Sequence, residues 1–195
     1  MNQNLALFLL FLAAGLPLFV LFLLEKCVDL RSYRKLGMTD KIAKVWSLEI
    51  LILVVSQVLN ALAACLLITN FNDISALILL YFPPLPIWAL IVLYLFERKN
   101  IHDALHKHSF KTKLLVTNLV LPLAFHISYQ YFLLWYIIGD DLLEPTTFKQ
   151  HMIFGIGNIL LIILFVFIKI LVQKQLVKRI RNQLLTEQVP SGNTV

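Results

Sequence analysis

The chain has 195 residues, of which 59% are hydrophobic and only 14% charged, and its formal net charge is +6. Soluble domains contain about 45–50% apolar and about 25% charged residues. The mean hydropathy of +0.82 therefore excludes an ordinary soluble fold, which would expose much of this apolar surface and aggregate.

The apolar residues gather in continuous stretches of about 20 residues, each long enough to cross a hydrocarbon core about 30 Å thick as a helix. There are five of them: 5–24, 45–69, 75–96, 114–138 and 152–172. Barrel strands alternate apolar and polar residues over about 10 positions, whereas a continuous apolar segment in lipid satisfies its backbone as a helix. We predict an all-α integral membrane protein, a bundle of five transmembrane helices.

The predicted bundle forms a single domain over residues 1–188, followed by a disordered tail at 189–195, which contains Pro190 and Gly192. The first stretch is expected to remain as a helix and not to be a cleaved signal peptide. No basic residue precedes it, its apolar core is long, and no small-residue cleavage pattern precedes Glu25.

The basic residues are distributed very unevenly between the two sides of this bundle. Segment 25–44 has six Lys and Arg, segment 97–113 has five, and the chain from Lys169 onward has five, whereas the other two loops have only Lys149. Five helices place the three basic segments on one side, and the positive-inside rule makes that side cytoplasmic. The N-terminus is therefore predicted outside and the C-terminus inside.

This topology, together with contact between the basic segments and anionic lipid, accounts for the positive charge. No nucleic-acid partner is needed to explain it. The expected partners are the lipid bilayer and either a membrane protein or further copies of the chain, and the expected location is a plasma or inner membrane.

A polar stripe runs along the second stretch. At 100° per residue, Glu49, Ser56 and Asn60 lie within about 40° of one another, so this face is expected to meet protein or water and not lipid. One interpretation is helix packing through interhelical hydrogen bonds. The other is a ligand or ion path, and Glu49 could instead reach water or pair with Lys44.

A second polar group lies in the fourth stretch, where His126, Tyr129 and Gln130 form one wedge near the bilayer midplane. We expect this wedge to meet Gln57 or Asn60, which lie at a similar depth. His126 is interpreted as a neutral, hydrogen-bonded residue, with a proton relay as the alternative.

The third stretch contains YFPPLPIW at residues 81–88. Proline removes a backbone donor and breaks the helical ladder, so the third helix should kink or unwind there. A kink alone or a substrate site built on a broken helix both remain open.

Residues 102–108 read HDALHKH. With Asn100 as a helix cap, His102 and His106 would share one face at i, i+4, which makes them weak candidates for a metal pair. A zinc site needs three or four ligands, so no metal and no cofactor is expected. A basic loop whose charge rises as the pH falls toward about 6.5 is the favoured interpretation.

After the fifth stretch, apolar residues recur at helical spacing between basic ones. The pattern predicts that residues 173–187 continue the fifth helix into the cytoplasm as a short amphipathic helix, lying along the inner leaflet or against segment 25–44. Lys169, near the inner end of the fifth helix, is expected to extend its ammonium group to the interface.

These features favour a non-enzymatic protein that acts through helix, lipid or partner contacts, such as an accessory subunit, an assembly factor or an immunity-type factor. The alternative is a small transport or channel component lined by the second, third and fourth helices. A third interpretation is a membrane-bound metal or redox enzyme that uses the cytoplasmic histidines.

Overall fold

The computed structural model describes residues 15–70, 84–105, 108–139 and 148–188, together with residues 5, 8, 9 and 12. All regular structure in these residues is helical, which confirms the predicted all-α class for the described part of the chain. The elements are α2 (Leu16–Lys35), α3 (Thr39–Asn70), α5 (Pro84–Asn100), the 3₁₀-helix η1 (His102–Leu105), α6 (His108–Leu115), the π-helical turn η2 (Val116–Val120), α7 (Leu121–Gly139) and α8 (Phe148–Gln188).

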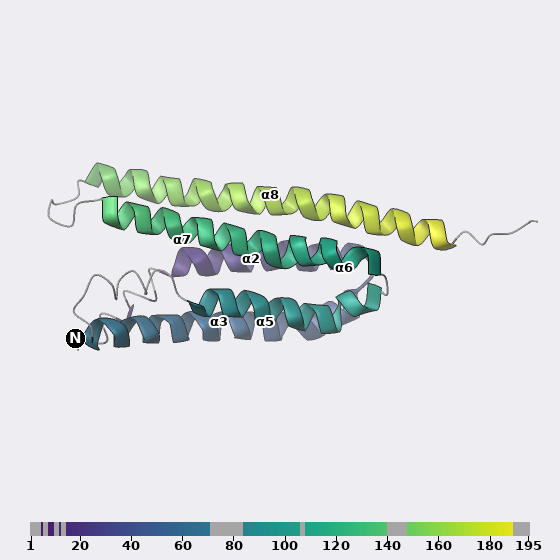
Figure 1. Ribbon diagram of the computed structural model, residues 1–195, viewed down its shortest axis with the longest axis horizontal. Coiled ribbons are helices and arrows are strands. Elements are labelled where there is room, and N and C mark those ends of the chain that lie inside the picture. The colour runs from purple at the N-terminus through teal and green to yellow at the C-terminus, as the bar shows by residue number, and fades with distance from the viewer. Residues whose placement is uncertain are drawn as a thin grey trace, which may run out of the picture.

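The helices lie along one long axis, and α2 occupies the middle of the bundle (Figure 1). It packs against α8 on one side and α3 on the other, and α3 packs in turn against α5. The continuous helix made by α6, η2 and α7 contacts α2, α5 and α8. Because α2 contacts most of the other elements, the side chains on its buried face make up much of the bundle interior.

A tight turn reverses the chain between α2 and α3. Gly37 has φ of +80°, a left-handed conformation that favours glycine. The amide of Met38 donates to the carbonyl of Tyr33 at 3.2 Å, and that of Gly37 to Arg34 at 3.1 Å. This bonding is the glycine-terminated helix end that satisfies the last carbonyls of a helix.

Three of the described helical stretches are long and apolar enough to cross a membrane: Thr39–Ala63, Phe110–Gln130 and Gly155–Thr186. They overlap three of the five predicted spans, 45–69, 114–138 and 152–172. Residues 71–83 and 140–147, which include parts of the predicted third span and of an outer loop, lie outside the described residues, as does the tail at 189–195.

One predicted boundary needs correction. The first helix does not end at Leu24, because α2 continues to Lys35. The predicted continuation of the fifth helix over 173–187 is confirmed, because α8 is one helix from Phe148 to Gln188 and extends past the other helices at its C-terminal end (Figure 1). The basic, apolar-striped segment is thus a continuation of the last helix.

That continuation packs against the chain instead of lying apart from it. Leu176 and Ile180 are buried in an apolar cluster with Tyr33, and Arg181 donates to the carbonyl of Lys35 at 3.3 Å. Of the two predicted placements, contact with segment 25–44 is the one observed.

The helix of the proline motif begins at Pro84. Proline suits the first turn of a helix, where its missing N–H would have had no partner. The residues before Pro84 are outside the described part, so the predicted kink stays a prediction.

Apolar side chains form separate clusters along the bundle axis. One cluster lies at the end nearest the α2–α3 turn and includes Leu30, Phe110 and Leu114. Further along the bundle, Leu21 packs with Phe125 and Phe165, and Phe22 packs with Leu53, Leu90 and Leu93 in a third cluster. Between the first cluster and the others lies a layer of buried polar and charged side chains.

Candidate functional site

Four oppositely charged side chains meet in that layer, and we call them the ionic cluster: Lys26, Asp29, Glu97 and Lys169. Lys26 Nζ lies 2.7 Å from Glu97 Oε1 and 3.6 Å from Asp29 Oδ2. Lys169 Nζ lies 2.9 Å from Asp29 Oδ1. All four side chains are at most 3% exposed, so two ammonium and two carboxylate groups balance one another away from water.

A π-helical turn supplies part of this cluster, and its sequence explains why. The amide of Leu121 donates to the carbonyl of Val116, five residues back, and the next residue, Pro122, has no N–H to give. The carbonyl of Thr117 is therefore left without a helical donor, and Lys169 Nζ bonds to it at 2.6 Å. Such turns occur often at functional sites.

Asn118, in the same turn, joins the cluster to its neighbours. Its amide nitrogen donates to the hydroxyl of Tyr33, and its oxygen accepts from Gln173 at 2.7 Å and from Lys169 at 3.4 Å. Gln173 also donates to Asp29. Asn118 is fully buried, and its bonds link η2 to α2 and α8.

The Tyr33 hydroxyl lies between two titratable groups. It is 3.3 Å from Glu97 Oε2 and 2.8 Å from His102 Nε2. His102 Nε2 is 3.8 Å from the same Glu97 oxygen. A proton can therefore be shared among a carboxylate, a phenol and an imidazole within hydrogen-bonding distance.

Glu49, one of the predicted site residues, adjoins this layer. Its side chain is 1% exposed, so it does not reach water, and neither of its oxygens meets a donor in the described residues. A buried carboxyl group without a hydrogen-bond donor is costly to ionise.

His102 connects the layer to the surface. It lines a pocket of about 200 Å³ with Tyr94, Arg98, Asp103 and other residues. Burial lowers the pKa of His102 to about 4 from an ordinary value of 6.5. The predicted loop charge that rises near pH 6.5 is therefore wrong for this histidine, which is neutral at that pH.

His126 has a partner that the sequence did not indicate. Its Nε2 lies 3.2 Å from Glu25 Oε2, and its ring stacks on Phe22 with 3.7 Å between centroids. Glu25 and His126 are at most 1% exposed. The expected contact of this histidine with Gln57 or Asn60 is wrong, and Gln57 instead donates to the carbonyl of Leu12 at 3.5 Å.

Tyr129 and Gln130, the other two residues of the wedge, lie one helical turn further from the ionic cluster than His126. The Tyr129 hydroxyl donates to Asn158 Oδ1 at 2.5 Å. The Gln130 side chain is 1% exposed, and neither its oxygen nor its nitrogen bonds to another described residue. His126, Tyr129 and Gln130 are thus all directed into the bundle, as predicted.

The rest of the predicted stripe on α3 does not join them. The Ser56 hydroxyl bonds to the carbonyl of Leu53 on its own helix at 2.9 Å. Asn60 is half-buried, and no contact among the described residues brings it to the wedge on α7. Of the stripe, only Glu49 lies in the polar layer.

The candidate metal pair is not assembled in the described residues. His102 is in a 3₁₀-helix, and His106 lies outside the described part. Asn100 is the last residue of α5 and donates to the carbonyl of Phe96 at 2.8 Å, so it is not the predicted cap. Among the described residues, no three His, Cys, Asp or Glu side chains gather as metal ligands would.

The sequence interpretation missed most of the ionic cluster. It treated Lys26 and Asp29 as loop residues, and it expected Lys169 to reach the interface, whereas Lys169 is fully buried. A signal was present, because residues 25, 29 and 33 follow the helical spacing of the buried face of α2. Extending the first helix beyond Leu24 would have placed their side chains inside.

No protein-family model, curated protein or solved structure matches this chain. Its function has to be inferred from its own side chains.

Proposed function

We propose that the chain is a proton-translocating component of a membrane transport system, with five transmembrane helices, the N-terminus outside and the C-terminus inside a plasma or inner membrane. The topology is supported by the three long apolar helices and by the sixteen basic residues that it places on the cytoplasmic side. The ionic cluster then lies toward the cytoplasmic face.

The observation that carries the proposal is a column of buried protonatable and hydrogen-bonding groups from α2, η2, α7 and α8, with Glu97 from α5 and His102 from η1. From the cytoplasmic side it comprises His102, Tyr33, Glu97, Asn118, Asp29, Lys169, Glu25, His126, Tyr129 and Asn158. Asp29 and Glu25 are one helical turn apart, as are His126 and Tyr129. From Asn118 to Tyr129 the column extends along about 16 Å of helix, more than half of a hydrocarbon core about 30 Å thick.

Stability alone is a poor explanation for these charges. Replacing a buried ion pair with packed apolar residues is often neutral or stabilising, and ionisable residues at membrane depth are costly and commonly mark proton or ion paths. If these side chains served only to hold the helices together, apolar residues would be expected at their positions.

The pocket at His102 supplies the cytoplasmic opening. Its lining includes four charged or polar side chains beside His102, namely Arg98, Asp103, Lys111 and Thr112, which suit a water-filled entrance. The imidazole Nδ1 is buried and has no hydrogen-bond partner among the described residues, so it would take a proton through a water that enters from this pocket. Protons would pass from there to Tyr33 and the Glu97 carboxyl.

The path differs from the one that the sequence predicted. The lining elements are α2, η2, α7 and α8 with one residue each from α5 and η1, and not α3, α5 and α7. The partner-binding role that the sequence favoured stays a prediction, because an apolar outer face meets lipid and a partner helix equally well.

The test is proton flux into liposomes that contain the purified full-length protein and a trapped pH-sensitive dye. With an inward proton gradient imposed and charge compensated by potassium and valinomycin, we expect faster acidification than in protein-free liposomes. Glu25→Gln should slow it at least tenfold, because amide nitrogen and oxygen do not exchange a proton as a carboxyl does. Lys178→Gln, an exposed change on α8, should leave the flux unchanged.

Two results would contradict the proposal. Equal acidification with and without wild-type protein would show that the protein does not translocate protons. Flux that is lost in Asn60→Ala and retained in Glu25→Gln would move the path to α3, as the sequence predicted.

A further inference from the structure

A groove of about 480 Å³ runs between α2 and α8 on the outside of the bundle. Its apolar wall includes Leu24, Val28, Val166 and Ile170, and its basic residues are Arg31, Lys35 and Lys174. No acidic side chain is among the described residues that line it.

α2 and α8 run in the same direction, so the depth of each groove residue in the membrane follows from its position along its helix. Leu21 of α2 packs with Phe165 of α8, and further along, the carbonyl of Lys35 meets Arg181. In the proposed topology the apolar residues of both helices therefore lie within the hydrocarbon core. The basic residues of both helices lie together at its cytoplasmic edge, where Arg181 adds a fourth cation.

We infer that this groove is a binding site for one anionic phospholipid of the cytoplasmic leaflet, whose acyl chain lies on the apolar wall and whose phosphate meets Arg31, Lys35 and Lys174. Arginine and lysine both bind phosphate, arginine through two parallel hydrogen bonds. Basic pockets between transmembrane helices on the cytoplasmic side suit anionic head groups. A soluble acidic partner would not account for the apolar half of the groove.

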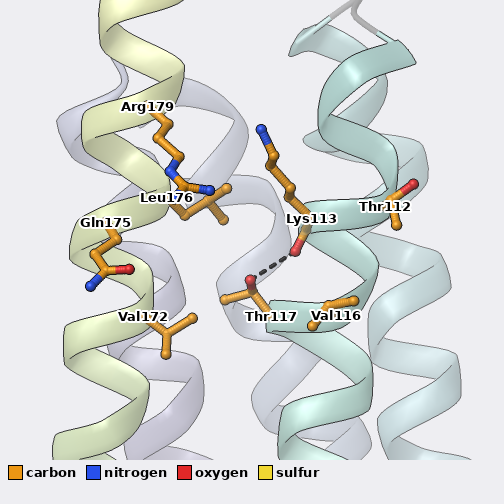
Figure 2. A pocket seen from close by; sticks show the side chains of 8 residues that line it. All are labelled: Thr112, Lys113, Val116, Thr117, Val172, Gln175, Leu176 and Arg179. Atoms are coloured by element: carbon orange, nitrogen blue, oxygen red, sulfur yellow. Dashed lines mark hydrogen bonds between the residues drawn. The ribbon is translucent and has the colours of Figure 1, made fainter.

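A smaller groove on the other side of α8 serves as a comparison. Figure 2 shows Lys113 and Arg179 on its opposite walls, with Thr112, Thr117 and Gln175 also lining it. Its volume is about 220 Å³, less than half that of the α2–α8 groove. It offers positive charge at the same membrane edge with little room for an acyl chain.

The experiment titrates full-length protein in mild detergent with phosphatidylglycerol, with phosphatidylcholine of the same chains, and with inorganic phosphate, and counts lipid adducts by native mass spectrometry. We expect phosphatidylglycerol to bind at least tenfold more tightly than phosphatidylcholine. Inorganic phosphate at equal concentration should not compete. The variant R31Q/K35Q/K174Q should lose this preference, since each cation near an anionic surface contributes about fivefold.

A charge-matched control is K111Q/K113Q/R179Q, which removes three cations from α6 and from the side of α8 that faces it, and it should bind phosphatidylglycerol within twofold of wild type. Equal losses in the two triple variants would overturn the inference in favour of diffuse electrostatic attraction. Competition by inorganic phosphate would overturn it in favour of a simple anion site.

A second variant tests the apolar wall without changing charge. Ile170 is 44% exposed, so Ile170→Trp should fold normally while filling the groove, and we expect at least a tenfold loss of phosphatidylglycerol binding. Unchanged binding in this variant would overturn the site even if the triple variant failed to fold.

Discussion

α2, α8 and the continuous α6–η2–α7 helix meet in two chemically different layers along the bundle axis. We call the layer nearer the α2–α3 turn the inner layer and the one further from it the outer layer. In the outer layer, Leu21 of α2 packs with Phe125 of α7 and Phe165 of α8, and the two phenylalanine rings stack with 4.4 Å between centroids. In the inner layer, their places are taken by Asp29, Asn118 and Lys169, all fully buried.

The comparison distinguishes contacts that only hold the helices together from contacts that we connect with function. Lipid tails are as apolar as leucine, so the outer layer is held by close packing and a few hydrogen bonds, and small changes there should have small effects. The inner layer holds charges that are stable only while every partner is present. It is therefore expected to be intolerant of single substitutions, although it contributes little net stability.

The largest effect is expected from Lys169→Met. It leaves Asp29 without its closest ammonium group and the carbonyl of Thr117 without a donor. Breaking a buried ion pair by removing one partner costs about 3–5 kcal/mol. Unfolding in mixed detergent and SDS measures the loss of free energy.

Its matched control is Lys174→Met, one turn and a residue further along α8 and exposed, with an expected change within about 0.5 kcal/mol. Equal losses in the two variants would mean that the cost comes from removing any lysine from α8 and not from breaking the buried ion pair.

A smaller effect is expected from pH at His102. Its pKa is about 4 in the folded protein against 6.5 ordinarily, so the unfolded state binds the proton first. The free energy of unfolding should be unaffected above pH 6.5 and should fall as the pH drops toward 4. At 1.36 kcal/mol per pKa unit, the fall amounts to about 3 kcal/mol at most.

The measurement is the thermal midpoint of wild type and of His102→Gln between pH 4 and 7. Because a glutamine side chain does not titrate, the difference between the two curves isolates the histidine from the carboxyl groups nearby. Parallel curves would show that His102 reaches water freely in the folded protein.

The two layers also differ in how far the sequence predicts them. Apolar runs identified α3, α7 and the apolar part of α8, because continuous hydrophobicity is a local property of the chain. The ionic cluster pairs residues far apart in sequence, such as Lys26 and Glu97, which are 71 positions apart. Hydropathy assigns a charge beside an apolar run to the interface, and it cannot tell that its partner lies at the same depth on another helix.

His126 illustrates the same limit. The sequence placed it inside the bundle correctly from its position in an apolar run. Its partner, Glu25, is 101 residues away and directly follows the predicted end of the first helix. Only the continuation of α2 to Lys35 brings the two together.

The smallest effect is expected in the outer layer, from Tyr129→Phe. The change removes the hydroxyl that donates to Asn158 and keeps the ring that packs with Leu21 and Phe125. Hydrogen bonds between membrane helices contribute about 0.6 kcal/mol on average, so unfolding in mixed detergent should change by about that amount, several times less than for Lys169→Met. A loss as large as that of Lys169→Met would mean that the outer layer is also built around a polar contact. If the small loss is accompanied by slower proton flux in liposomes, the hydroxyl belongs to the proton path and not to the scaffold.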